Sequence, residues 1–201
     1  MLEAAELECE RGGRTLFRSL SFALQPGELL RIAGANGSGK TSLLRILCGL
    51  LAPTAGRVRW NGNDIARARE DYTAELVYLG HAAAVKDDLT APENLSIACA
   101  IAGDPVDEQA VRVALERFEV PQKLPVRRLS QGQRRRAALA RLALAGERML
   151  WLLDEPFTAL DVQGITVLKD LIEKHTARGG AAVFTTHQDA GVPATRVIEL
   201  A

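Results

Sequence analysis

The sequence lacks an excess of charge of either sign, because its 25 Lys and Arg side chains are matched by 25 Asp and Glu side chains. A neutral balance gives no electrostatic basis for holding nucleic acid or an anionic lipid surface, so we expect no nucleic-acid partner. Cysteine is scarce as well. Cys9, Cys48 and Cys99 lie far apart, without the spacing of a metal site or of a CxxCH haem site. We expect them to be reduced, buried thiols in a reducing compartment.

Long hydrophobic runs are also missing. The most apolar stretch, Ala137 to Ala145, contains Arg141 and is far shorter than the roughly 18 residues that a membrane-spanning helix requires. The opening residues, MLEAAELECE, are acidic and do not follow the basic-then-apolar pattern of a signal peptide. We therefore expect a cytoplasmic chain whose link to a membrane, if it has one, is made through a partner.

The sequence does contain an alternation of strand and helix patterns, which predicts an α/β fold within 201 residues, enough for one domain. Residues 82–134 have a helical pattern and are expected to form an insertion between the core segments 1–81 and 135–201. Strands are expected at Leu20–Leu24, Leu29–Ala33, Val58–Trp60, Met149–Leu153, Ala181–Thr186 and Arg196–Leu200. Helices are expected at Leu43–Leu50, from Thr90, at Val111–Phe118 and at Ile165–His175.

A glycine-rich segment between a strand pattern and a helix pattern fits the phosphate-binding motif GxxxxGK[ST]. Glycines let successive backbone N–H groups turn inward, and the helix N-terminus adds the positive end of its dipole. We expect ATP phosphates to bind here, with Lys40 at the β- and γ-phosphates and Thr41 at Mg²⁺. The alternative is an ordinary glycine turn. The predicted binding residues are Gly34, Ala35, Asn36, Gly37, Ser38, Gly39, Lys40, Thr41 and Ser42.

Two adjacent acids, Asp154 and Glu155, follow the apolar strand that begins at Met149. A buried strand delivers such side chains to the edge of a parallel sheet, where ligands bind. Beside a phosphate loop, we expect Asp154 to hold Mg²⁺ through water and Glu155 to polarise the attacking water. The alternative is a solvated pair of loop residues, and a nucleotide kinase would need an acceptor pocket for which the sequence has no motif.

Three further motifs follow in a set order, and with them the chain resembles the ABC ATPase family over its whole length. Leu129 to Gln133, LSQGQ, is similar to the family signature LSGGQ, and the helix Arg134–Leu144 should follow it. Thr158 to Asp161 is similar to the D-loop, and Thr185-Thr186-His187 to the switch histidine segment. The resemblance implies a RecA-like P-loop NTPase core with a small antiparallel β subdomain and a helical subdomain.

The resemblance also implies a mechanism in which two copies face head to tail. ATP on the phosphate loop of one copy would be covered by Ser130, Gly132, Gln133 and Asp161 of the other. His187 would contact the γ-phosphate and position Glu155, and membrane-spanning permease subunits would be the further partners. Without the family context, Ser130 is a helix N-cap and His187 a histidine at the end of a strand.

Two positions depart from the family pattern. The aromatic residue that stacks on adenine is replaced by Arg11, whose guanidinium plane can also stack on a purine, and Phe17 is a rival candidate. The glutamine after the strand Leu76–Leu79 is replaced by Gly80-His81. We expect His81 to take over the contact with the nucleotide site and the membrane subunit; the alternative is a surface histidine without a role.

Within the family, three runs resemble the ATP-binding subunits of the bacterial cytochrome c maturation system, which are described as haem exporters. The runs are Tyr78 to His81, Asp154 to Asp161 and Thr185 to Gln188. This implies ATP-driven haem export or release of a haem chaperone, with haem handled by other subunits and this chain at the cytoplasmic face of the membrane. The alternatives are a transporter for another cargo, a soluble ABC ATPase and a catalytically silent dimerisation module.

Overall fold

The structure is a computed structural model that describes residues 1–187 and 191–200, so Gln188 of the last run lies outside the described residues. The chain divides into two compact units. The first comprises Met1–Tyr78, Arg148–Pro156 and the chain from His175 on, and the second comprises Leu79–Glu147 and Phe157–Lys174. We call them the core unit and the helical unit. The boundaries predicted from the sequence stay a prediction.

An antiparallel sheet opens the core unit. In the described residues its order is β2-β1-β4-β5, with bounds Arg14–Leu24, Leu2–Arg11, Ala55–Trp60 and Asn63–Asp64. The turn Asn61-Gly62 joins β4 to β5, and both of its residues have positive φ, as a tight hairpin requires. The predicted antiparallel β region is thereby confirmed.

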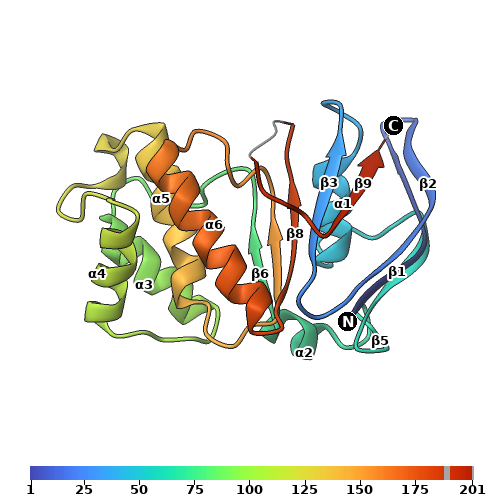
Figure 1. Ribbon diagram of the computed structural model, residues 1–201, viewed down its shortest axis with the longest axis horizontal. Helices are drawn as coiled ribbons and strands as arrows, with labels where there is room; N and C mark the ends of the chain where they lie inside the picture. The colour runs from blue at the N-terminus through green and yellow to red at the C-terminus, as the bar shows by residue number, and fades with distance from the viewer. Residues whose placement is uncertain (188–190, 201) are drawn as a thin grey trace. The chain divides into compact units, whose positions relative to one another are not determined.

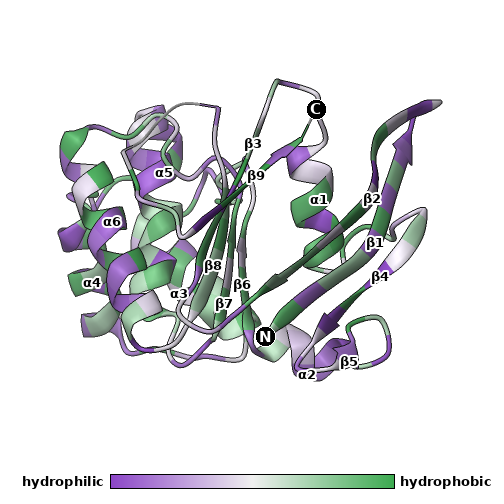
Figure 2. Cartoon of the chain, turned by 45° about the vertical axis from the view of Figure 1, so that its right-hand side comes forward, coloured by the Kyte–Doolittle hydropathy of each residue, from purple (hydrophilic) through white to green (hydrophobic). Residues whose placement is uncertain are grey.

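Strand β1 was not predicted from the sequence, and its geometry explains why. Leu2 and Ala4 are buried, but beyond Glu6 the buried positions are Leu7 and Cys9, so the alternation changes phase. Glu6 has φ +48°, and the register with β2 shifts between Ala4 and Leu7. A β-bulge inserts one residue in this way and hides the two-residue period from a pattern search. Figure 2 shows the hydrophobic and hydrophilic bands along β1 and β2.

The second sheet of the core unit has the order β6-β7-β8-β3-β9 in the part of the chain that the structure describes (Figure 1). Its strands are Leu76–Leu79, Leu150–Leu153, Ala181–Thr185, Leu29–Gly34 and Arg196–Leu200. The pairs β7–β8, β8–β3 and β3–β9 are parallel. Every residue of β7 and β8 is buried, as expected for central strands of a parallel sheet. The carboxyl ends of β3, β8 and β7 therefore meet at one edge.

One hydrophobic cluster joins the two sheets and helix α1 (Lys40–Leu47) in the core unit. It includes Leu7 from β1 and Leu152 from β7, both fully buried. Helix α1 ends earlier than the spacing of Leu43, Leu47 and Leu50 predicted. Gly49 has φ +72°, a conformation that ends helices, and Leu50 beyond it is 61% exposed. The core unit also contains the short helix α2 (Arg69–Ala74), which was not predicted.

The helical unit contains α3 (Ala91–Ile101), α4 (Glu108–Arg117), the 3-10 helix η1 (Val126–Arg128), α5 (Gln131–Leu139) and the 3-10 helix η2 (Ala140–Leu144). Thr90 caps α3 in a capping box with Glu93, as predicted. The helix predicted at Arg134–Leu144 instead begins at Gln131, and its last turn is the 3-10 helix. Helix α6 (Val162–Ala177) crosses from the helical unit into the core unit.

Candidate nucleotide-binding site

The phosphate loop connects the carboxyl end of β3 to the first residue of α1. Gly34, Gly37 and Gly39 have φ values of +142°, +84° and +103°, which only glycine adopts at low cost. At Gly34 a side chain is also excluded by space, because a Cβ atom would lie 2.4 Å from the carbonyl oxygen of Leu200. The backbone of the loop thus depends on the glycines that the motif specifies.

Two side chains of the loop are placed to receive an anion. The buried ammonium group of Lys40 donates to the carbonyl oxygens of Gly34 and Ala35, at 2.7 and 2.9 Å, and so lies inside the loop. The hydroxyl of Ser38 is buried and has no hydrogen-bond partner among the described residues. A charged donor and a hydroxyl beside the N-terminus of α1 suit the oxygens of a phosphate chain.

The first acid, Asp154, follows β7 and is 1% exposed. Its Oδ1 atom accepts hydrogen bonds from the hydroxyls of Thr41, at 3.2 Å, and Thr185, at 2.8 Å. The contact with Thr41 joins the phosphate loop to the acid pair, because β3 and β7 end at the same edge of the sheet. The sequence placed Thr185 in the switch histidine segment but did not predict it as a site residue, because a threonine at the end of a buried strand gives little indication of a role.

The residues present fit Mg²⁺. Thr41 and Asp154 bring a hydroxyl and a carboxylate together, and such hard oxygen donors are the ligands that Mg²⁺ prefers. No group of three or more His, Cys, Asp or Glu suited to a metal occurs among the described residues. Mg²⁺ in nucleotide sites needs no such cage, because phosphates and water complete its shell.

The second acid, Glu155, contacts the predicted switch histidine. Its Oε2 atom lies 3.0 Å from Nδ1 of His187, and the side chains of Glu155 and His187 are 12% and 41% exposed. Glu155 has φ +51°, a left-handed conformation that costs a residue with a side chain about 1–2 kcal/mol. Its backbone N–H donates to the Thr185 hydroxyl at 2.8 Å. The Glu155 carboxylate is thereby held next to the His187 imidazole, at the edge where the carboxyl ends of the strands meet.

The signature residues lie in the helical unit, at the start of α5. Ser130 and Gln133 form a capping box: the Ser130 hydroxyl accepts from the Gln133 N–H at 3.2 Å, and the Gln133 side chain accepts from the Ser130 N–H at 2.9 Å. At Gly132 a Cβ atom would lie 2.8 Å from the carbonyl oxygen of Ala159. Gly132 therefore permits close approach of the D-loop backbone.

Asp161 closes the D-loop at the start of α6. Its Oδ1 atom accepts from the Gly164 N–H at 2.8 Å, and its Oδ2 atom forms an ion pair with Arg136 at 2.9 Å. Asp161 thus acts as a helix cap, in addition to the nucleotide contact that the resemblance implied, which stays a prediction.

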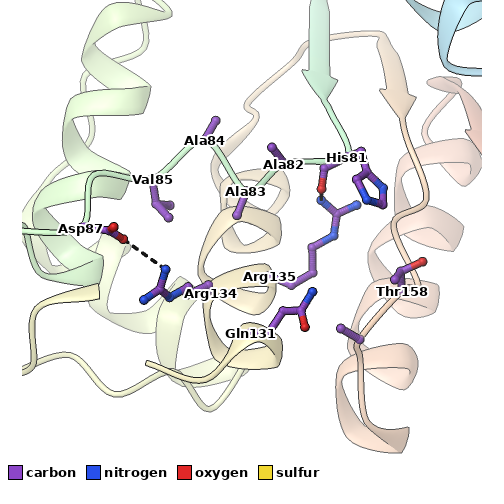
Figure 3. A pocket seen from close by; sticks show the side chains of 11 residues that line it. His81, Ala82, Ala83, Ala84, Val85, Asp87, Gln131, Arg134, Arg135 and Thr158 are labelled. Atoms are coloured by element: carbon purple, nitrogen blue, oxygen red, sulfur yellow. Dashed lines mark hydrogen bonds and ion pairs between the residues drawn. The ribbon is translucent and has the colours of Figure 1, made fainter. Parts of the chain in front are cut away.

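A pocket of about 410 Å³ in the helical unit lies beside His81 (Figure 3). It is formed by the loop from His81 to Val85, by residues of α5 and by Thr158 and Ala159. The buried side chain of Arg135 donates to the carbonyl oxygens of Gly80 and His81, at 2.8 and 3.2 Å. Arg135, which was not singled out from the sequence, thus ties the loop after β6 to the signature helix. The role predicted for His81 stays a prediction.

The two candidates for adenine stacking differ in exposure. Arg11 is exposed at the end of β1, whereas Phe17 is 8% exposed and its ring would lie 3.2 Å from a Cβ atom at Gly39. Phe17 therefore packs against Gly39 of the phosphate loop, and Arg11 is the candidate whose side chain is exposed. Stacking of Arg11 on adenine stays a prediction.

Known proteins are similar to this chain over most of its length. The sequence model of the ABC transporter family matches residues 17–158. The chain is 57% identical over 199 residues to the cytochrome c biogenesis ATP-binding export protein CcmA of Aromatoleum aromaticum, covering 97% of this chain and 93% of that protein. The corresponding protein of Nitrosomonas europaea is 52% identical over 191 residues, covering 94% and 89%.

A solved structure shares the fold. The ATP-binding cassette MJ0796, in a dimeric post-hydrolysis state with ADP and phosphate, superposes with a TM-score of 0.83 at 24% identity, covering all of this chain and 94% of the other. Among the described residues, no helix has the length and apolar character needed to span a membrane. The predicted P-loop NTPase fold is thus confirmed, and the chain belongs to the ABC transporter family as an ATPase cassette in the group of cytochrome c biogenesis ATP-binding export proteins.

Proposed function

We propose that the chain hydrolyses ATP as the motor subunit of an export complex that serves cytochrome c biogenesis. The observation that carries the proposal is the pair Glu155 and His187, 3.0 Å apart, on the sheet edge where Asp154 contacts Thr41 of the phosphate loop. The names of the relatives supply the process. Haem is the cargo, or the group carried by a chaperone that the complex releases, and it is handled by other subunits.

In this proposal the groups divide the work of hydrolysis. Lys40 and the loop N–H groups neutralise the triphosphate. Thr41 and, through water, Asp154 would hold Mg²⁺, and the ion would neutralise charge on the phosphates. Glu155 orients the attacking water and accepts its proton, while His187 keeps the carboxylate in place. Arg11 stacks on the adenine ring, since guanidinium planes stack on aromatic rings.

The proposal includes a dimer and membrane partners. Two copies face each other head to tail, so that Ser130, Gly132 and Gln133 of one copy cover the ATP held by the other. A second set of N–H donors at the start of α5 suits a γ-phosphate. Permease subunits hold the pair at the cytoplasmic face of the membrane, and His81 relays closure to them.

The test is ATP hydrolysis by the purified chain, alone and with its co-expressed membrane subunits, for the wild type and the variant Glu155→Gln. We expect Glu155→Gln to bind ATP, to form a stable dimer in its presence and to hydrolyse ATP at least about a hundredfold more slowly. Glu147→Gln, at an exposed position just before β7, makes the same change of charge outside the site and should keep the wild-type rate.

Three results would contradict the proposal. Equal rates for the wild type and Glu155→Gln would exclude Glu155 as the base. A wild type that does not hydrolyse ATP even with its membrane subunits would support the alternative of a catalytically silent dimerisation module. A rate that does not respond to the membrane subunits would support a soluble ATPase.

A further inference from the structure

Thr185 lies at the junction between the two acids, and the sheet explains why. Strand β8 pairs in parallel with β7 on one side and with β3 on the other. Leu153, the last residue of β7, is in register with Phe184, so the residue that follows β7, Asp154, comes beside Thr185. On the other side, Thr185 is in register with Ile32, which precedes the phosphate loop. The register thus places position 185 between the loop and the acids.

The hydroxyl of Thr185 makes one hydrogen bond to each acidic residue. It donates to Oδ1 of Asp154 at 2.8 Å and accepts from the backbone N–H of Glu155 at 2.8 Å. A hydroxyl can donate and accept at the same time, which valine and alanine cannot do. Thr185 is fully buried, so water does not compete for either bond.

The bond to Glu155 falls on a residue with a strained backbone. With φ +51°, Glu155 has the left-handed conformation that places its carboxylate 3.0 Å from His187. Such conformations persist where surrounding contacts hold them. The Thr185 hydroxyl, which accepts a hydrogen bond from the Glu155 N–H, is such a contact. The same hydroxyl donates to Oδ1 of Asp154, the oxygen that also accepts from Thr41.

We propose that Thr185 is a positioning residue for ATP hydrolysis, whose hydroxyl holds Asp154 and the backbone of Glu155 in one arrangement. The inference rests on the function proposed above. Thr185 does not touch the reacting atoms. It holds the Asp154 carboxylate where that group would bind Mg²⁺ and the Glu155 carboxylate where that group would orient water, and small displacements of such groups lower a rate strongly.

The experiment compares Thr185→Val, which keeps the shape and removes the hydroxyl, with Thr185→Ser, which keeps the hydroxyl. We expect Thr185→Val to lower kcat about ten- to a hundredfold, to change KM for ATP less than about threefold and to require more Mg²⁺ for half-maximal hydrolysis. Thr185→Ser should stay within about threefold of the wild-type kcat. The affinity for ATP in the presence of EDTA, measured by fluorescence, should be equal in the wild type and both variants. Addition of Mg²⁺ should increase this affinity less in Thr185→Val than in the other two proteins.

The control is Val183→Ala, which removes apolar bulk two residues earlier on the same side of β8 but no hydrogen bond. It should unfold at lower temperature and keep the wild-type kcat and Mg²⁺ dependence. The inference is overturned if Thr185→Val behaves as the wild type, if Thr185→Ser loses as much activity as Thr185→Val, or if Val183→Ala shows the same loss. An inactive wild type would overturn the proposed function and this inference with it, while an active wild type beside an unimpaired Thr185→Val overturns the inference alone.

Discussion

At the scale of single residues, the glycines of the phosphate loop differ in what they require. Gly34 and Gly37 both have positive φ, but they differ in the space around them. A Cβ atom at Gly34 would lie 2.4 Å from the Leu200 carbonyl oxygen and 2.7 Å from the Ser38 hydroxyl, whereas one at Gly37 would have no atom within 4 Å. We expect Gly34→Ala to lower the free energy of unfolding by roughly 2–4 kcal/mol, through steric conflict added to backbone strain. Gly37→Ala should cost roughly 1–2 kcal/mol, through strain alone. Urea unfolding of both variants checks this, and equal losses would show that the conflict at Gly34 is relieved by movement.

At the scale of elements, the end of α6 is held against β7 and β8 by a neutral histidine. The His175 ring stacks on Trp151 at 3.9 Å between ring centres, and its Nε2 atom lies 3.1 Å from the carbonyl oxygen of Ala181. Arg178 lies 3.3 Å from Nδ1, so Nε2 donates and Nδ1 accepts. Burial lowers the pKa of His175 from 6.5 to about 4, because the charged ring would lose its hydration.

The lowered pKa makes stability depend on pH. The unfolded chain binds a proton at His175 as the pH falls through about 6.5, while the folded protein resists until about pH 4. The contribution of the neutral His175 ring to the free energy of unfolding is therefore fully present above pH 6.5, and it is lost as the pH falls from about 6.5 to about 4. We expect His175→Phe to lose about 2 kcal/mol less than the wild type between about pH 7 and pH 4.5, measured by urea unfolding. If His175→Phe loses as much stability as the wild type over this range, folding does not lower the pKa of His175.

At the scale of the whole molecule, the residues of the proposed site divide between the two units. Lys40 and Glu155 belong to the core unit, and Ser130 belongs to the helical unit. The proposed head-to-tail dimer combines the phosphate loop of one copy with the signature of the other. Two defective chains can then form one intact site, which a site built within a single chain cannot do.

Mixing the variants Lys40→Ala and Ser130→Arg tests this arrangement. Each alone should be inactive, because every site in its dimer lacks one side. After mixing, hydrolysis should return to at most about a quarter of the wild-type rate, since half of the dimers are mixed and each has one intact site of two. Size-exclusion chromatography with ATP verifies that dimers form. Mixed dimers without activity would contradict the arrangement.

Much of the fold and site could be predicted because their patterns are local. The phosphate loop, the acids after β7 and the capping box of α3 each require particular residue types within a few positions. Prediction failed where neighbouring structure altered a local pattern. The bulge at Glu6 concealed β1, and the αL conformation of Gly49 ended α1 before Leu50.

The sequence by itself determined the family and predicted the nucleotide and the residues that face it, because the chemistry of phosphate binding and water activation leaves little choice of residue types. Only the tertiary structure decided which groups hold those residues in place. The bridge from Thr185 to the two acids and the stack of His175 on Trp151 join positions that are distant in sequence. Their contacts depend on strand order and register, which place residues of separate segments side by side without leaving a mark in either segment.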